Sequence, residues 1–273
     1  MNDVLVLGAT GTTGGRVVEF LRGRSVPVRL ATRTPGPDPR TVRFDWWDRA
    51  SYSPALRGVR AVYLVAPIGV EQPVPIVELF LKVAAREGVR RVVLLGSSAV
   101  DAASTGTGAL YELVRATMPE WAVLRPSWFM QNFLGDHVVA HGVRTGAIAT
   151  ATGEGRVAFI DPADIAAVAG HALVDETPHN TEHLLTGPEA LSYADTAAIL
   201  SAHLGRPIVH RAISTAEAVA RYQDSGIPVE FAKLLAELDE DIRAGTEDRV
   251  TDTVRAVTGR IPRSFREFVR VHL

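Results

Sequence analysis

The sequence predicts an α/β protein, with a doubly wound parallel sheet and a smaller, mostly helical C-terminal lobe. Three features predict this fold class. Short apolar runs alternate with segments of helical spacing through the first half of the chain. The first apolar run leads into a glycine-rich turn and then a helix. Helical segments predominate in the second half. We expect two domains, 1–155 and 156–273, with one or two strands of the second returning to the main sheet.

The elements of the first half follow from its apolar runs and its glycines. The expected strands cover 4–7, 26–31, 42–44, 61–66, 92–95 and 122–124. The expected helices begin at residue 14 and cover 75–87 and 109–117. Ligands of such sheets bind beyond the carboxyl ends of the strands. We therefore expect one crevice to be formed by the loops at 8–14, 32–34, 65–69, 96–101 and 126–133.

The second half mixes short strands with helices. Strands are expected over 148–153, 157–160 and 183–188. Asp161 and Pro162 are typical of a helix start, and this helix should run to Val174. Further helices are expected over 192–204, 215–225, 228–244, 248–257 and 263–271. By analogy with similar folds, this lobe should close the substrate crevice.

The first turn carries the most informative motif, with glycines at positions 8, 11 and 14. Gly8 permits a tight turn, Gly11 lets the backbone approach a pyrophosphate, and Gly14 lets helix and strand pack closely. The free N–H groups at the start of the helix attract phosphates. The motif is typical of a Rossmann-type dinucleotide site, and its G-x-x-G-x-x-G spacing favours the short-chain dehydrogenases. The alternative is a turn that is rich in glycine only for packing.

The end of the second strand indicates which dinucleotide binds. In an NAD site, an acidic residue about 20 positions past the motif binds the ribose. Here Arg33 stands 33 − 14 = 19 residues past the last glycine, and no carboxylate is present. Arg33 can pair with a 2′-phosphate, which favours NADP(H), although a solvated arginine is the alternative. Asp45 is placed to contact the adenine amine. The predicted cofactor-binding residues are Gly8, Thr10, Gly11, Thr12, Thr13, Gly14, Thr32, Arg33, Asp45, Val65, Ala66, Pro67, Gly96, Ser97, Pro126 and Trp128.

Composition narrows the possible partners. The formal charge of −2 argues against nucleic acid or an anionic membrane as the main partner. The absence of cysteine excludes disulfides, thiol nucleophiles and cysteine-bound zinc. No apolar run is long enough for a membrane span, and no basic leader precedes the first strand. We expect a cytoplasmic protein that acts on a small molecule, and the sequence leaves open whether it forms an oligomer.

Several segments resemble one family over nearly the whole chain. They include LRPSWFMQNF at 124–133, ATGEGRVAFI at 151–160, LTGPEALSY at 185–193 and GTEDR at 245–249. On these segments the chain resembles the NmrA-like, atypical short-chain dehydrogenases, and within them the ergot-alkaloid dehydrogenases of the festuclavine and agroclavine type. The resemblance implies reduction of a C=N (iminium) bond by a nicotinamide hydride. The same wider family includes quinone reductases, isoflavone-reductase-like enzymes and NADP-binding regulators without known turnover.

The catalytic pair of ordinary short-chain dehydrogenases is absent. Those enzymes carry Tyr-x-x-x-Lys before the sixth strand, and the lysine lowers the pKa of the tyrosine. Ala103 and Thr107 stand at the corresponding positions here. Tyr111, with Arg115 four residues later, lies about two helical turns after the position of the usual catalytic tyrosine. This offset favours a ring that packs within the fold, and a catalytic Tyr111 is the alternative. Ser97 follows the fifth strand and is a second catalytic candidate. The alternative is that it only belongs to a turn at the end of the strand.

The loop after the sixth strand is the expected substrate site. Large side chains at this position line a crevice more readily than they fill a strand interior. The predicted substrate-binding residues are Ser98, Trp128, Phe129, Met130 and Asn132. The alternative for the large side chains is that they pack in the core. The alternative for Asn132 is that its side chain only fixes the conformation of its loop. His137 and His141 have helical spacing, but no nearby carboxylate completes a ligand set, so we expect no metal site.

Two hypotheses of function follow. The first is an NADPH-dependent reductase of secondary metabolism, which delivers hydride to a cyclic imine or iminium, or to a similarly polarised C=C or C=O bond. An iminium carries its own positive charge, so the missing tyrosine–lysine pair suits it. The second is an NADP-binding sensor of the NmrA kind without turnover. The sequence does not identify the substrate or the stereochemistry of hydride transfer.

Overall fold

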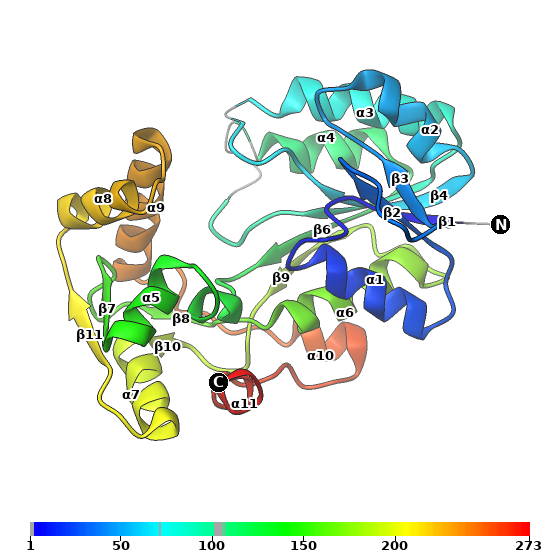
Figure 1. Cartoon of the computed structure of the whole chain (residues 1–273). Coiled ribbons are helices and arrows are strands. Elements are labelled where there is room, and N and C mark those ends of the chain that lie inside the picture. Colours follow the sequence, from blue (N-terminus) through cyan, green and yellow to red (C-terminus); the bar gives the residue numbers. More distant parts are fainter. Residues whose placement is uncertain (1–2, 71, 101–105, 107) are drawn as a thin grey trace. The chain divides into compact units, whose positions relative to one another are not determined.

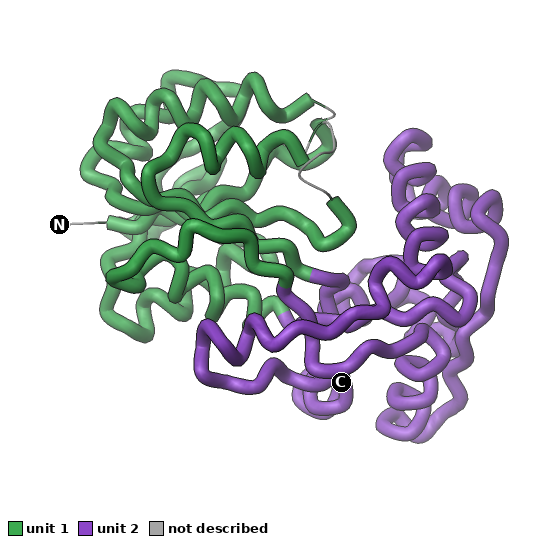
Figure 2. Tube along the Cα trace, turned by 180° about the vertical axis from the view of Figure 1, so that it is seen from behind, with its two compact units in different colours: residues 1–126, 162–184 green, residues 127–161, 185–273 purple. Residues whose placement is uncertain are grey.

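The computed structural model describes residues 3–70, 72–100, 106 and 108–273. The chain divides into two compact units (Figure 2). Unit 1 consists of residues 1–126 and 162–184, and unit 2 of residues 127–161 and 185–273. This division differs from the expected boundary at 155/156 because the helix and strand within 162–184 complete unit 1. A strand from the second half of the chain, β9 (Thr181–Leu185), lies in the main sheet.

Unit 1 is built on a seven-stranded sheet in the order β3-β2-β1-β4-β5-β6-β9 (Figure 1). Its strands are β1 (Asp3–Val6), β2 (Val28–Thr32), β3 (Thr41–Arg43), β4 (Val59–Val65), β5 (Arg91–Leu95), β6 (Glu120–Pro126) and β9 (Thr181–Leu185). All neighbouring pairs from β3 to β6 are parallel. This order reverses direction between β1 and β4, which is the switch point where ligands of doubly wound sheets bind. The predicted fold class is confirmed.

Helices cover both faces of this sheet (Figure 1). One face carries α1 (Gly14–Gly23) and α6 (Pro162–Val174), and the other carries α2 (Tyr52–Leu56), α3 (Val74–Arg86) and α4 (Ala109–Thr117). A short 3-10 helix, η1 (Arg49–Ser51), precedes α2. Gly170 lets α1 and α6 pack closely, since a Cβ atom there would lie 2.1 Å from the Phe20 ring. On the other face, buried side chains of α2, α3 and α4 form one core with the strands.

Unit 2 is mostly helical, with two small sheets. Its helices are η2 (Met130–Phe133), α5 (Val138–Thr145), α7 (Tyr193–Leu204), α8 (Thr215–Asp224), α9 (Val229–Arg243), α10 (Thr253–Thr258) and α11 (Phe265–His272). Its strands are β7 (Ala147–Thr150), β8 (Arg156–Val157), β10 (Leu191–Ser192) and β11 (Val209–Ala212). Helices α7, α8 and α11 each begin with a capping box, in which Ser192, Ser214 and Ser264 pair with an acidic residue three positions later.

The short strands of unit 2 pair in an order that the sequence did not suggest. The strands expected on either side of Glu154–Gly155 do not pair with each other; β7 pairs with β11 and β8 with β10. A buried carboxylate contributes to this arrangement, because Asp239 Oδ2 accepts a hydrogen bond of 2.9 Å from the backbone N–H of Ala151, just after β7. No helix in the described ranges combines the length and the apolar content that crossing a membrane requires.

Candidate functional site

The glycine turn between β1 and α1 is built as its spacing predicts. Gly8 has φ +63°, in the left-handed region that favours glycine. The N–H of Gly11 donates to the carbonyl of Gly8 at 2.8 Å, which closes the turn. A Cβ atom at Gly14 would lie 2.2 Å from the Gly8 oxygen. Residues 8 and 14 therefore need glycine for internal reasons, so that the helix can start against the turn.

Gly11 has a weaker internal reason to be glycine. Its φ is not positive, and a Cβ atom there would approach only the Gly8 oxygen, at 3.2 Å. It is exposed together with Thr10 and Thr12, whereas Thr13 is buried. The first turn of α1 contains no acidic residue, and the side chain of Thr13 does not cap it. The turn thus presents a bare backbone and the positive end of a helix dipole, which suits a pyrophosphate.

The ends of β2 and β3 carry the candidates for the adenosine half. Arg33 directly follows β2 and is exposed, and it makes no ion pair with any residue that the structure describes. The Thr32 hydroxyl is buried and has no hydrogen-bond partner within the same ranges. Asp45 lies just beyond β3, where its Oδ1 accepts a hydrogen bond of 2.9 Å from the Trp47 N–H. Trp46 packs against the unit 1 core, but Trp47 is 71% exposed.

The ends of β4, β5 and β6 meet at the same edge of the sheet. Val65 ends β4, and Ala66 and Pro67 follow it, all three half-buried. Beyond β5, the N–H of Gly96 donates to Leu124 O at 2.7 Å and that of Ser98 donates to Pro126 O at 3.0 Å. These bonds continue the β5–β6 ladder, so they bring Gly96, Ser97 and Pro126 together at the carboxyl edge.

Tyr111 lies under this edge rather than on its surface. Its side chain is 1% exposed, and its hydroxyl bonds to the backbone of Ser97. Arg115 is exposed and pairs with Glu112 at 3.5 Å. Ala103 and Thr107, which stand at the positions of the usual tyrosine and lysine, lie outside the described residues. The geometry thus presents Tyr111 as a packed, hydrogen-bonded side chain.

The predicted substrate residues after β6 belong to unit 2, whereas Ser98, which follows β5, is buried in unit 1. Trp128 and Phe129 are half-buried, and an isolated parallel bridge joins Phe129 to Ile160. Met130 differs from the expectation of a pocket residue, because η2 turns its side chain into the core of unit 2 and leaves it 0% exposed. Asn132 is half-buried, and its N–H donates to Phe129 O at 3.1 Å.

His137 and His141 belong to a helix start. His137 precedes α5, and its Nδ1 accepts a hydrogen bond of 3.2 Å from the Val139 N–H. Partial desolvation of its imidazole ring lowers the pKa of His137, although the residue as a whole is exposed. Among the described residues, no group of three or more histidine, aspartate or glutamate side chains is arranged to hold a metal ion.

A residue that sequence reasoning did not assign is Arg125, next to the end of β6. Its Nη1 pairs with Glu182 Oε2 at 3.0 Å, and its Nη2 donates to Val100 O at 2.9 Å. Arg125 therefore holds the loop after β5 at Val100. An arginine directly before a strand-end proline is a signal that could have found it.

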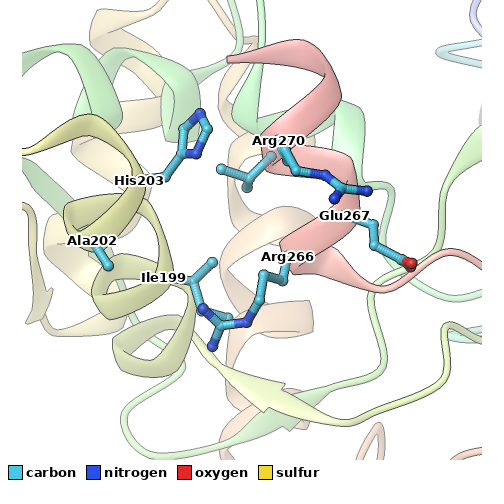
Figure 3. Close-up of a pocket in the computed structure, with 7 residues that line it drawn as sticks. Ile199, Ala202, His203, Arg266, Glu267 and Arg270 are labelled. Atoms are coloured by element: carbon cyan, nitrogen blue, oxygen red, sulfur yellow. The ribbon is translucent and has the colours of Figure 1, made fainter.

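Unit 2 contains a separate cavity of about 280 Å³ between α7 and α11 (Figure 3). Ile199, Ala202 and Val269 give it an apolar wall, and His203, Arg266 and Arg270 also line it. None of the predicted site residues is among its lining residues.

The glycine turn, the strand order and the helices on both faces define a Rossmann-type domain. The chain belongs to the NmrA-like family, whose model matches residues 1–268. It is 47% identical over 276 residues to a Bacillus subtilis (strain 168) protein named "Uncharacterized oxidoreductase YesF", covering 99% of this chain and 95% of that protein. It is 36% identical over 279 residues to the "Festuclavine dehydrogenase easG" of Aspergillus fumigatus, covering 97% of this chain and 96% of that protein. The same fold is found in the structure of the NADPH-dependent quinone oxidoreductase QOR2 of Escherichia coli, complexed with NADPH. The TM-score is 0.85 at 22% identity, and the match covers 98% of this chain and 99% of that chain.

Proposed function

We propose that this protein is an NADPH-dependent oxidoreductase that reduces a small organic molecule. The observation that carries the proposal is the turn between β1 and α1, where Gly11 is exposed and has little internal reason to be glycine. This turn leaves a bare backbone and a helix N-terminus for the pyrophosphate. Membership of the NmrA-like family and the oxidoreductase names of its relatives support the same activity.

The preference for NADPH over NADH rests on Arg33. Its guanidinium is exposed at the end of β2, and no acidic residue stands there to bind the ribose hydroxyls. Arginine pairs well with a phosphate group because its planar fork donates two parallel hydrogen bonds. The 2′-phosphate of NADP(H) would therefore be held by Arg33, with the Thr32 hydroxyl close by in the sequence.

We propose that the acceptor is a cyclic imine or iminium, or a similarly polarised C=C or C=O bond, of a compound of secondary metabolism. The nicotinamide supplies the hydride when it is bound. The protein then has to orient the acceptor, and an iminium needs no proton donor at carbon. The hydroxyl of Tyr111 is already hydrogen-bonded within the fold, which favours an acceptor of this kind. A relative named festuclavine dehydrogenase, at 36% identity, supports it too.

The candidate residues for binding the acceptor follow β5 and β6 in the sequence. Ser97 and Ser98 follow β5 at the edge where the nicotinamide half is expected, whereas Trp128, Phe129 and Asn132 follow β6. Ser97 offers a hydroxyl to the nicotinamide or the acceptor. The aromatic side chains offer apolar surface, which ligand sites commonly use.

Oxidation of NADPH, followed by its absorbance, tests the proposal with a panel of cyclic imines, quinones and enones. We expect turnover with at least one class of acceptor, and a lower rate with NADH. Binding of NADPH without oxidation by any acceptor would favour the NADP-binding sensor instead. Failure to bind either dinucleotide would refute both functions.

A further inference from the structure

In the described part of the loop after β5, every backbone N–H from Gly96 to Val100 donates a hydrogen bond. Beyond the two bonds that extend the ladder to β6, the N–H of Ser97 donates to the Tyr111 hydroxyl at 2.9 Å. The same hydroxyl donates to the carbonyl of Ser97 at 3.2 Å. Arg125 holds the carbonyl of Val100 at 2.9 Å. A loop fixed in this way keeps the Ser97 side chain in one position at the carboxyl edge of the sheet.

The ring of Tyr111 is fitted closely to this loop. A Cβ atom at Gly96 would lie 2.4 Å from the Tyr111 hydroxyl oxygen and 2.7 Å from the ring carbon that bears it. The residue before Ser97 must therefore be glycine for the ring to reach the loop. Helix α4 supplies Tyr111 to the buried core of unit 1, so the hydroxyl is the one polar part of a side chain that is otherwise packed.

Ser97 is the residue that this contact orients. Its Oγ accepts a hydrogen bond of 3.3 Å from the Ala99 N–H. The hydroxyl proton then remains to be donated, because a serine hydroxyl both donates and accepts. A donor at the end of β5 is suited to a polar group of the nicotinamide or of the acceptor.

We propose that Tyr111 is a positioning residue, which acts through the backbone of Ser97 and takes no part in proton transfer. This inference rests on the proposed function, because it assigns the orientation of Ser97 to the reductase site. It explains why a tyrosine two turns away from the usual catalytic position still lies beside the site. The hydroxyl bonds to both the N–H and the carbonyl of one residue, so its loss weakens the hold on that residue between the ladder bonds of Gly96 and Ser98.

The first experiment needs no turnover. Amide hydrogen exchange, measured by NMR on the full chain, compares the wild type with Tyr111→Phe. We expect the Ser97 amide to exchange about three- to tenfold faster, the change expected from losing one hydrogen bond. Amides elsewhere in β5 and β6 should be unchanged, which also shows that the variant is folded.

Tyr52→Phe is the matched control for this experiment. Tyr52 belongs to the same buried core, and its hydroxyl donates to a backbone carbonyl, Trp46 O, at 2.7 Å. Its loss should leave the Ser97 amide unchanged. If Tyr111→Phe also leaves the Ser97 amide unchanged, the positioning role is wrong, whether or not the protein proves to be a reductase.

The second experiment uses turnover and separates positioning from acid catalysis. Tyr111→Phe should lower kcat by less than about tenfold, whereas losing a general acid costs about 10²–10⁴. The pH profile should keep its shape. In a Ser97→Ala background, Tyr111→Phe should have little further effect on kcat, because its influence passes through Ser97. Full additivity, or the loss of one limb of the pH profile, would overturn the inference. A wild type without turnover would refute the proposed function and leave the exchange experiment as the test of positioning.

Discussion

Substituting Gly14 and Gly15 separately tests the fit of α1 against the glycine turn. The two glycines are neighbours in the first turn of the same helix. A Cβ atom at Gly14 would lie 2.2 Å from the Gly8 oxygen and 2.7 Å from its carbon, both backbone atoms that cannot swing away. At Gly15 the nearest atom is the Ala9 oxygen at 3.5 Å, an ordinary contact. The substitutions at Gly14 and Gly15 thus differ in how well a methyl group fits, and hardly at all in their effect on helix propensity.

The expected magnitudes follow from this difference. Alanine in place of helical glycine gains up to about 1 kcal/mol, and this gain applies to both positions. Overpacking costs about 1–3 kcal/mol, and it applies to Gly14 alone. Gly14→Ala should therefore be less stable than Gly15→Ala by about 1–3 kcal/mol. Gly14→Ala should also bind NADPH more weakly, because the turn must move to admit the methyl group.

Urea unfolding and calorimetry of NADPH binding measure these two effects. Gly15→Ala serves as the control for folding and for the loss of a glycine at the helix start. Equal stabilities and equal NADPH affinities in the two variants would refute the reasoning, since the close approach of Gly14 to Gly8 would then have no consequence.

Three further predictions concern the cofactor and the response to pH. Arg33→Ala should weaken the binding of NADPH by about 1.5–3 kcal/mol, the scale of a charged hydrogen bond, and should change the binding of NADH little. If calorimetry shows equal losses of affinity for both cofactors, Arg33 does not bind the 2′-phosphate. Gly11→Val should abolish binding of both dinucleotides, and retained affinity would contradict the pyrophosphate assignment. Burial, with the charge of nearby His179, lowers the pKa of His183 from 6.5 to about 4. A histidine with a lowered pKa binds its proton more weakly in the folded state, so stability is full above pH 6.5 and falls as the pH drops toward 4, by at most about 3 kcal/mol. His183→Asn should flatten this part of the unfolding curve, and an unchanged slope would show that other groups cause it.

The elements of unit 1 could be predicted because their signals are local. Each buried parallel strand is an apolar run of the chain, and the helix predicted over 109–117 coincides with α4 (Ala109–Thr117). Strand β11 has no such signal, since Val209, Arg211 and Ala212 are exposed. Its pairing with β7 joins segments about 60 residues apart, which no periodicity within either segment reveals. For the same reason, local patterns could not show that the chain returns to unit 1 at residue 162 and leaves it at residue 184.

The residues of the candidate site also differ in whether local sequence patterns predict their roles. The roles of Gly8 and Gly14 follow from spacing, because a turn between a strand and a helix constrains its own backbone. The orientation of Met130 does not, since it depends on η2 and on the core that receives the side chain. Tyr111 lies between these cases. Its place on a helix, about two turns later than the usual catalytic position, is visible in the sequence and favours a packed ring.

What the sequence could not supply for Tyr111 is the partner of its hydroxyl. A buried hydroxyl needs a hydrogen bond, so a tyrosine on the core face of a helix implies a nearby polar group. Here that group is the backbone of Ser97, 14 residues earlier in the chain, and it is reachable only because Gly96 has no side chain. The glycine, the serine and the tyrosine each have an ordinary local explanation, a strand-end turn or a packed helix. Their juxtaposition turns three ordinary residues into one constraint on the backbone at the edge of the sheet.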